Sequence, residues 1–233
     1  MQIKKAMILA AGYGKRLMPL TRETPKPLIK IGQKNFLERA IEILIKIGVT
    51  EIVINVHYLS DKIKEFLKSK SYVISIKIIE EKELLLDTGG GILNATKDFV
   101  DEPFYVLNPD TIWNKNYFEE LKILENLYYQ KKKPVLLLVN KKNTHDKSFK
   151  GDFNLSIKNL ISRDKENTFI FTGAQILNRS IFNGMEDKIF SMNKVWDNLI
   201  KEECLFGQES NQTFFHVNNL DIYKQIKESK FID

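Results

Sequence analysis

Cysteine is nearly absent from this sequence of 233 residues, in which Cys204 alone carries a thiol. One cysteine cannot form an internal disulfide, so nothing requires an oxidising compartment, and we expect a cytoplasmic protein. Long hydrophobic runs are missing too. The apolar run at residues 6–11 ends at Gly12 and is too short for a secretory signal. No run reaches the roughly 18 residues of a membrane-spanning helix, so no membrane partner is expected.

Arginine is scarce among the 36 basic residues, which outnumber the 30 acidic ones and give a formal net charge of +6. The arginines are Arg16, Arg22, Arg39, Arg163 and Arg179. A positive excess can indicate nucleic-acid binding, but the lysines here are spread along the whole chain. Spread lysines are typical of a solvated surface. We therefore expect no nucleic-acid partner, whereas a small anionic substrate fits.

The composition is that of a globular protein, with 43% hydrophobic and 28% charged residues. The length favours one domain over two. Strand-like and helix-like segments alternate over residues 1–140, which predicts an α/β fold with a mostly parallel sheet. After Asn140, short alternating runs indicate an α+β elaboration.

The hydrophobic pattern places the elements of this fold. Strands are predicted at residues 5–10, 51–56, 74–79, 104–107, 134–139, 153–157 and 168–177. Helices are predicted at residues 36–47, 60–68, 91–99, 117–130, 193–202 and 220–228. Ser60 is expected to cap the second helix. Three glycines are expected to precede the third helix as a loop.

The strongest chemical motif is LAAGYGKRL at residues 9–17, where a strand runs directly into a loop with Gly12 and Gly14. Glycine tolerates positive φ and carries no side chain, so backbone N–H groups can approach phosphate oxygens. The third glycine of the dinucleotide fingerprint is missing, and Asn55 stands where a ribose-binding acid is wanted. The loop therefore indicates a nucleotide and disfavours hydride transfer.

Two cations follow this loop. In TRETPKPL, residues 21–28, Pro25 and Pro27 fix φ and are expected to hold Thr24 and Lys26 extended. Together with Arg16, Lys26 would place two positive charges around a polyphosphate. Phosphoryl and nucleotidyl transfer need such charges where negative charge develops.

Residues 9–28, LAAGYGKRLMPLTRETPKPL, resemble the signature of the sugar-1-phosphate nucleotidyltransferases, or nucleotide-sugar pyrophosphorylases. Later segments resemble the N-acetylmuramate-1-phosphate uridylyltransferase-like branch: INVHYL at 54–59, LDTGGG at 86–91, NPD at 108–110, GDF at 151–153, FTG at 171–173, and Asn193 with Trp196-Asp197. The resemblance implies a single Rossmann-like domain over residues 1–233. Residues 1–140 would bind the nucleotide and residues 141–233 the sugar phosphate.

The resemblance also implies a role for individual residues. Arg16 and Lys26 would stabilise triphosphate charge, and Asp110, after a strand's carboxyl end, would hold Mg²⁺. Nucleotide contacts are implied for Ala10, Ala11, Gly12, Gly14, Thr88 and Gly89. Backbone donors of residues 88–91 would meet the base or ribose. Sugar-phosphate contacts are implied for Asn108, Asp152 and Gly173.

One segment departs from the family pattern. Many relatives have Asp-Val-Gly-Thr and use that aspartate as second metal ligand, where this chain has His-Val-Asn-Asn at 216–219. Imidazole is a softer ligand, so Mn²⁺ becomes possible beside Mg²⁺. His216 can be a metal ligand, a phosphate-facing donor or a packed residue, and the sequence leaves these three open. His57 is expected to be a satisfied strand-edge residue and His145 to be solvated.

The resemblance favours UTP and N-acetylmuramate 1-phosphate as substrates, giving UDP-N-acetylmuramate in cell-wall recycling. A mannose or heptose 1-phosphate guanylyltransferase is the alternative within the same class. A non-catalytic nucleotide-sugar-binding regulator is the alternative from another class, because residues 216–219 are altered. No left-handed β-helix repeat is present, so no appended acyltransferase is expected.

Overall fold

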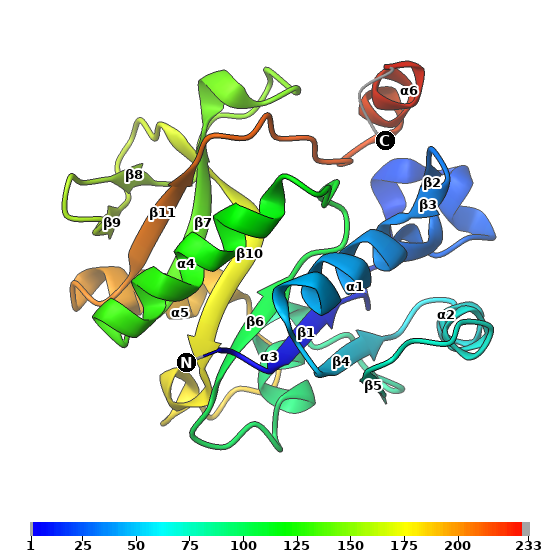
Figure 1. The fold of residues 1–233 in the computed structure, drawn as a ribbon, viewed down its shortest axis with the longest axis horizontal. Coiled ribbons are helices and arrows are strands. Elements are labelled where there is room, and N and C mark those ends of the chain that lie inside the picture. Colours follow the sequence, from blue (N-terminus) through cyan, green and yellow to red (C-terminus); the bar gives the residue numbers. More distant parts are fainter. Residues whose placement is uncertain (1, 230–233) are drawn as a thin grey trace.

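The computed structural model describes residues 2–229, and its centre is a seven-stranded sheet (Figure 1). The strands lie in the order β11-β7-β10-β6-β1-β4-β5. Their bounds are β1 Lys5–Leu9, β4 Glu51–Val56, β5 Ser75–Glu80, β6 Pro103–Leu107, β7 Val135–Asn140, β10 Phe169–Asn178 and β11 Phe206–Ser210. β10 runs antiparallel to both neighbours, and every other adjacent pair is parallel. The predicted α/β fold with a mostly parallel sheet is confirmed.

Helices cover both faces of this sheet (Figure 1). Their bounds are α1 Phe36–Ile47, α2 Ser60–Lys68, α3 Asp87–Ala95, α4 Tyr117–Lys131, α5 Met192–Lys201 and α6 Leu220–Glu228. α1 and α4 pack on one face with Ala6 and Ile8 of β1, and α3 and α5 pack on the other with Met7. Both faces are buried, as parallel sheets require. None of the helices within residues 2–229 combines the length and the hydropathy that a membrane-spanning helix needs.

α1 shows why the hydrophobic pattern predicts a helix well. The Asn35 side chain accepts a hydrogen bond from the Glu38 amide at 2.8 Å and caps the helix, and Gly48 at φ 97° ends it. Its apolar side chains line the sheet face. The predicted bounds, 36–47, are confirmed at both ends.

α3 begins four residues before its predicted start, so Gly89, Gly90 and Gly91 lie inside the helix and not in a loop before it. Close packing explains these residues. A Cβ at Gly89 would lie 2.4 Å from the Phe190 ring, and one at Gly90 would lie 2.2 Å from the Lys188 carbonyl oxygen. The low helix propensity of glycine is overridden because residues 188–190 approach the helix so closely.

One further expectation needs correction, and one strand lies outside the predicted elements. Leu59, at φ 51°, and not Ser60, precedes α2, and the Ser60 hydroxyl instead donates to Glu80 at 2.5 Å. The strand β11 was not predicted, because Phe206–Ser210 reads FGQES and lacks an apolar pattern. It pairs with β7, whose residues 135–139 are buried and supply the hydrophobic contacts. Short hairpins complete the fold: β2 Lys30–Ile31 with β3 Lys34–Asn35, and β8 Asn154–Leu155 with β9 Ile161–Ser162.

Residues 214–226 return to the N-terminal part of the chain. Val217, Ile222 and Ile226 pack with Leu17 and Ile29 in one buried cluster. The Tyr223 hydroxyl donates to the Lys30 carbonyl at 3.2 Å. The first and last parts of the chain thus lie side by side (Figure 1).

Candidate active site

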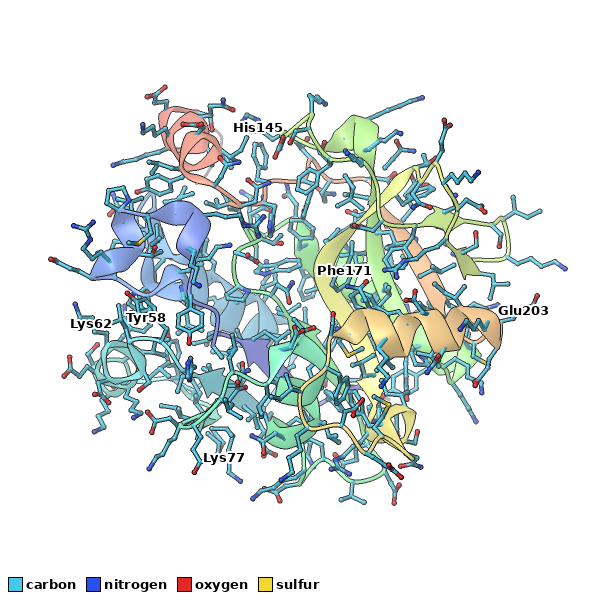
Figure 2. All side chains as sticks on the ribbon, turned by 180° about the vertical axis from the view of Figure 1, so that it is seen from behind. Tyr58, Lys62, Lys77, His145, Phe171 and Glu203 are labelled. Carbon is cyan, nitrogen blue, oxygen red and sulfur yellow. The ribbon has the colours of Figure 1, made fainter. Side chains whose placement is uncertain are left out.

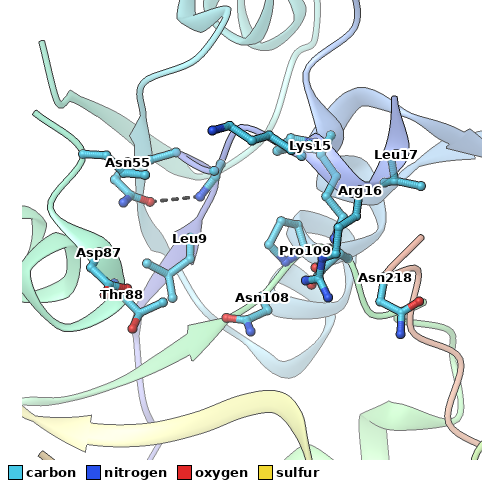
Figure 3. Close-up of a pocket in the computed structure, with 18 residues that line it drawn as sticks. Leu9, Lys15, Arg16, Leu17, Asn55, Asp87, Thr88, Asn108, Pro109 and Asn218 are labelled. Carbon is cyan, nitrogen blue, oxygen red and sulfur yellow. Dashed lines mark hydrogen bonds and ion pairs between the residues drawn. The ribbon is translucent and has the colours of Figure 1, made fainter. Parts of the chain in front are cut away.

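A cavity of about 400 Å³ opens at the carboxyl ends of β1, β4 and β6 (Figure 3). It is lined by Leu9, Ala10, Ala11, Gly12, Gly14, Lys15, Arg16, Leu17, Lys26, Pro27, Asn55, Leu85, Asp87, Thr88, Asn108, Pro109, Asp110 and Asn218. Open α/β sheets bind ligands at this edge. The cavity therefore brings together most of the predicted nucleotide-binding, cationic and metal-binding residues.

The glycine loop forms one wall of the cavity. Gly14 has φ +64°, and its carbonyl accepts hydrogen bonds from the Leu17 amide at 2.9 Å and the Thr21 hydroxyl at 3.0 Å. A Cβ there would lie 2.8 Å from the Thr21 methyl, so position 14 requires glycine. Gly12 differs, because a Cβ there would meet no atom within 4 Å. Gly12 leaves space open to the cavity.

Lys26 reaches the cavity from a 3₁₀ turn, Lys26–Leu28, and not from the extended conformation expected for it. Pro25 is extended, but Pro27 has a φ that fits a helical first turn. The Lys26 ammonium donates to the Asp110 carboxylate and forms an ion pair with it. The two predicted residues, 84 positions apart in sequence, are thus in direct contact.

Asp110 is held as an anion. Burial alone would raise its pKa, but the interactions with His216 and Lys26 outweigh burial and lower the pKa to about 2. Its Oδ1 atom is buried and has no hydrogen-bond partner within residues 2–229. A charged carboxylate with an unengaged oxygen suits a hard divalent cation.

His216 lies beside Asp110 because residues 215–217 run antiparallel to residues 110–112. Its Nε2 atom is 3.7 Å from Asp110 Oδ2, and its ring stacks on Phe214 with 5.8 Å between centroids. Burial lowers the His216 pKa, the Asp110 charge opposes this, and Lys26 and Arg16 reinforce it. The imidazole is therefore neutral at neutral pH, packed against an aromatic ring and next to the carboxylate.

Asn218 is a cavity residue that sequence reasoning missed. Its Nδ2 donates to Asp146 Oδ2 at 2.9 Å, while its Oδ1 is buried without a partner within residues 2–229. The amide orientation thus presents a free oxygen. The sequence contains one signal for Asn218, a polar residue two positions after His216. In the comparison with the family pattern, residues 218–219 indicate only that a Gly-Thr pair is replaced.

Arg16 belongs to a 3₁₀ turn, Lys15–Leu17, directly after the glycine loop. Its side chain extends across the cavity toward Asn108 and Asn218 (Figure 3). In the part of the chain that the structure describes, no hydrogen bond or ion pair engages its guanidinium. Its donors are therefore free for an anionic ligand.

The opposite wall comes from the start of α3. Thr88 lines the cavity, and its hydroxyl oxygen accepts a hydrogen bond from the Met192 amide at 2.9 Å. Gly89 does not line it, because its amide donates to the Phe190 carbonyl at 2.9 Å. The Gly90 amide makes the same bond at 3.0 Å. These two backbone donors, expected to face a base, are used within the protein.

Asn108 lines the cavity, and the other two predicted sugar-phosphate residues, Asp152 and Gly173, do not. The Gly173 carbonyl accepts from the Asn108 amide at 2.8 Å, and a Cβ at Gly173 would lie 2.9 Å from the Asn108 Cβ. Asp152 is exposed and accepts from the Phe171 amide at 2.9 Å. Phe171 and Gly173 both lie on β10, whose position Phe171 marks in Figure 2. Asp152 does not line the cavity.

The remaining histidines, His57 and His145, differ in whether the structure confirms their predicted surroundings. The His57 ring bonds the Tyr13 hydroxyl at 2.9 Å and the Glu81 carbonyl at 2.5 Å, so it is satisfied at its strand end as predicted. The expectation of a solvated His145 is wrong. Its ring packs 5.2 Å from Phe215, and its Nε2 is buried without a partner within residues 2–229.

Residues 5–151, more than half of the chain, match the family model described as "Nucleotidyl transferase". The chain belongs to this family. The nucleotidyltransferase is 28% identical over 225 residues to N-acetylmuramate alpha-1-phosphate uridylyltransferase of Caulobacter vibrioides, covering 93% of this chain and 92% of that protein. It is 34% identical over 184 residues to D-glycero-alpha-D-manno-heptose 1-phosphate guanylyltransferase of Campylobacter jejuni, covering 77% and 78%.

The fold of this nucleotidyltransferase is similar to that of HddC from Yersinia pseudotuberculosis. The TM-score is 0.77 at 24% identity, covering 97% of this chain and 99% of that one. The family and the relatives make the protein an enzyme of the sugar-1-phosphate nucleotidyltransferase class, which confirms the resemblance at residues 9–28. Enzymes of this family generally use divalent metal ions.

Proposed function

We propose that the enzyme joins UTP and N-acetylmuramate 1-phosphate to give UDP-N-acetylmuramate and pyrophosphate, a reaction of cell-wall recycling. A sugar-phosphate oxygen attacks the α-phosphorus, and the bond to pyrophosphate breaks. The match to the Caulobacter uridylyltransferase over nearly the full length of both chains carries this choice of substrates. The attacking oxygen is already anionic, so positioning and cations matter more than a general base.

In this proposal, Arg16 and Lys26 supply the positive charge that stabilises the triphosphate. Arg16 has an unengaged guanidinium at the cavity, and Lys26 is fixed by its ion pair with Asp110. Donors that are already oriented stabilise developing charge without reorganisation during the reaction. Arg16 would bind the outer phosphates, and Lys26 would face the α-phosphate beside Asp110.

Asp110 Oδ1 and Asn218 Oδ1 would hold Mg²⁺. These two oxygen atoms are buried and without partners within residues 2–229, and oxygen ligands suit this ion. The described residues contain no cluster of three or more His, Cys, Asp or Glu side chains, so phosphate and water would complete the shell. His216, 3.7 Å from Asp110, remains a candidate ligand, which keeps Mn²⁺ possible. When bound, the ion would neutralise triphosphate charge.

The two parts of the chain would divide the substrates. In residues 1–140, the nucleotide would contact Ala10, Ala11, Gly12 and Gly14 on one wall and Thr88 on the other. Asn108 would meet the sugar phosphate. In residues 141–233, Gly173 would support Asn108, and Asp152, which accepts from the Phe171 amide, would contact the sugar.

A guanylyltransferase acting on heptose 1-phosphate is the second candidate. The Campylobacter relative favours it, because its identity is higher at 34%, although the match is shorter. A mannose 1-phosphate guanylyltransferase is favoured by a match of 30% identity over 215 residues to the Drosophila melanogaster enzyme. The non-catalytic alternative is set aside, since the family and these relatives are enzymes.

A substrate matrix tests these candidates. Each of four nucleoside triphosphates is combined with N-acetylmuramate, heptose and mannose 1-phosphates, and pyrophosphate release is measured with Mg²⁺. We expect the highest kcat/KM for UTP with N-acetylmuramate 1-phosphate. A preference for GTP with heptose or mannose 1-phosphate would replace the first proposal by the second.

A further inference from the structure

Glu81 is a buried carboxylate that the proposed chemistry does not use. It follows β5 directly, and only 4% of its surface is exposed. Its Oε1 accepts a hydrogen bond from Asn55 Nδ2 at 2.7 Å, and its Oε2 accepts one from the Leu86 amide at 2.9 Å. Both carboxylate oxygens are therefore engaged by donors from different parts of the chain.

These contacts connect the two walls of the cavity. Asn55 Oδ1 accepts from the Ala10 amide at 2.9 Å, the bond drawn as a dashed line in Figure 3. A continuous series of hydrogen bonds thus runs from Ala10, at the glycine loop, through Asn55 and Glu81 to Leu86, which caps α3. Residues 9–12 line the cavity at one end of this series, and Leu85, Asp87 and Thr88 line it at the other.

Two further observations show that Glu81 is closely fitted. A Cβ at Gly91 of α3 would lie 2.9 Å from Asn55 Nδ2 and 3.0 Å from Glu81 Oε1, so the helix packs directly on the pair. The carboxylate also accepts from the Leu86 amide at the N-terminal end of α3, where the helix dipole favours an anion.

We propose that Glu81 is a positioning residue that fixes the distance between the two walls, and thereby the affinity for the nucleoside triphosphate. The inference rests on the proposed binding of that substrate in the cavity. A carboxylate accepts at both oxygens, which is what two facing donors require. An amide at position 81 would turn its own donor toward Asn55 or toward the Leu86 amide, and one hydrogen bond would be lost.

The test measures affinity for UTP and for GTP, with Mg²⁺, by calorimetry. Glu81→Gln and Asn55→Asp should each weaken binding about tenfold or more. In the double variant Asn55→Asp/Glu81→Gln, the amide introduced at position 81 donates to the carboxylate introduced at position 55. The Ala10 and Leu86 amides keep their acceptors, so affinity should return to within about threefold of wild type. KM for the sugar 1-phosphate should change little in every variant.

Glu80→Gln is the matched control, because Glu80 bonds Ser60 and Lys64 outside the cavity, and it should bind nucleotide like wild type. Melting temperatures identify any variant that fails to fold. If a single variant does not fold, the nucleotide affinity of the double variant decides whether Glu81 has the proposed role. Single variants with wild-type affinity, or a folded double variant that binds as weakly as they do, would overturn the role of Glu81. A wild-type protein that binds neither nucleotide would instead overturn the proposed function, and this inference with it.

Discussion

Lys26 is tied to Asp110 and also faces the space where the triphosphate is proposed to bind. Lys26→Ala should therefore lower kcat by about a hundredfold, equivalent to about 3 kcal/mol, with a smaller effect on folding. Pyrophosphate release and thermal melting measure the two effects. Lys34→Ala, which removes an exposed ion pair with Glu42, should leave kcat unchanged. Equal kcat in both variants would remove Lys26 from the mechanism.

Asp110 supplies charge as well as an oxygen ligand in the proposed metal site. Asp110→Asn keeps the shape but loses the anion, so Mn²⁺ binding measured by electron paramagnetic resonance should weaken by at least about tenfold. The Mg²⁺ concentration for half-maximal activity should rise in parallel. Asp98→Asn, at an exposed ion pair with Lys77, is the control and should titrate like wild type. Unaltered Mn²⁺ binding would exclude Asp110 as a ligand.

His216 makes stability depend on pH. Because burial lowers its pKa, the folded protein binds this proton more weakly than the unfolded chain does. Its contribution is complete above the unfolded value near about 6.5 and is lost as the pH falls toward the lower folded value. The melting temperature of wild type should fall across this range. His216→Asn should show a smaller decrease, and an identical decrease would show that other groups cause it.

The sequence identified Lys26, Asp110 and the glycine loop as candidates, but it could not show that Lys26 and Asp110 touch. That contact depends on how β6 and the N-terminal loop meet in three dimensions. Asn218 was missed for the same reason. Its importance comes from a buried Oδ1 with no partner within residues 2–229, at a residue that lines the cavity and whose Nδ2 is bonded to Asp146.

At the scale of elements, glycines in α3 and in the glycine loop serve opposite purposes. Gly90 of α3 allows close packing, whereas Gly12 of the loop leaves space open. Gly90→Ala should lower stability by about 2 kcal/mol, because its Cβ would overlap the Lys188 carbonyl. Gly12→Ala should leave melting unchanged, since its Cβ meets no protein atom, but should raise the KM for the nucleoside triphosphate. Melting curves and kinetics on both variants check the contrast. Equal melting temperatures for the two would contradict it.

Elements with an apolar period of their own were predictable, and elements shaped by their neighbours were not. α1 and α6 have the bounds that their sequence patterns predict. The start of α3 depends on residues 188–190, about a hundred positions away, and β11 depends on β7. The local sequence does not indicate such partners. Propensity therefore fails to predict these elements, because tertiary contacts override it.

For the whole molecule, the alternation of strands and helices sufficed to predict a mostly parallel sheet, but not the strand order. The antiparallel β10, at residues 169–178, lies between β6 and β7, so that residues before and after Asn140 contribute strands to one sheet. Loop lengths and apolar runs are compatible with several strand orders, and only the packing of both faces selects one.

α6 tests whether the last helix supports the cavity. Ile226 is fully buried against the N-terminal segment, so Ile226→Ala should cost about 3 kcal/mol of stability. It should also weaken Mn²⁺ binding, because Val217 packs with Ile226 and the next residue, Asn218, lines the cavity. Ile63→Ala, a buried isoleucine of α2 in a different cluster, should destabilise without changing Mn²⁺ affinity. Equal Mn²⁺ affinities in the two variants would separate α6 from the site.

The return of Val217, Ile222 and Ile226 to the N-terminal segment also sets the order in which the cavity is completed during synthesis. The glycine loop follows β1 and precedes every other strand of the sheet in chain order, whereas Asn218 follows them all. A growing chain on the ribosome can therefore form most of the sheet while the proposed metal site is incomplete. Unfinished chains would consume no nucleotide, and turnover would begin only after this late segment has emerged and docked.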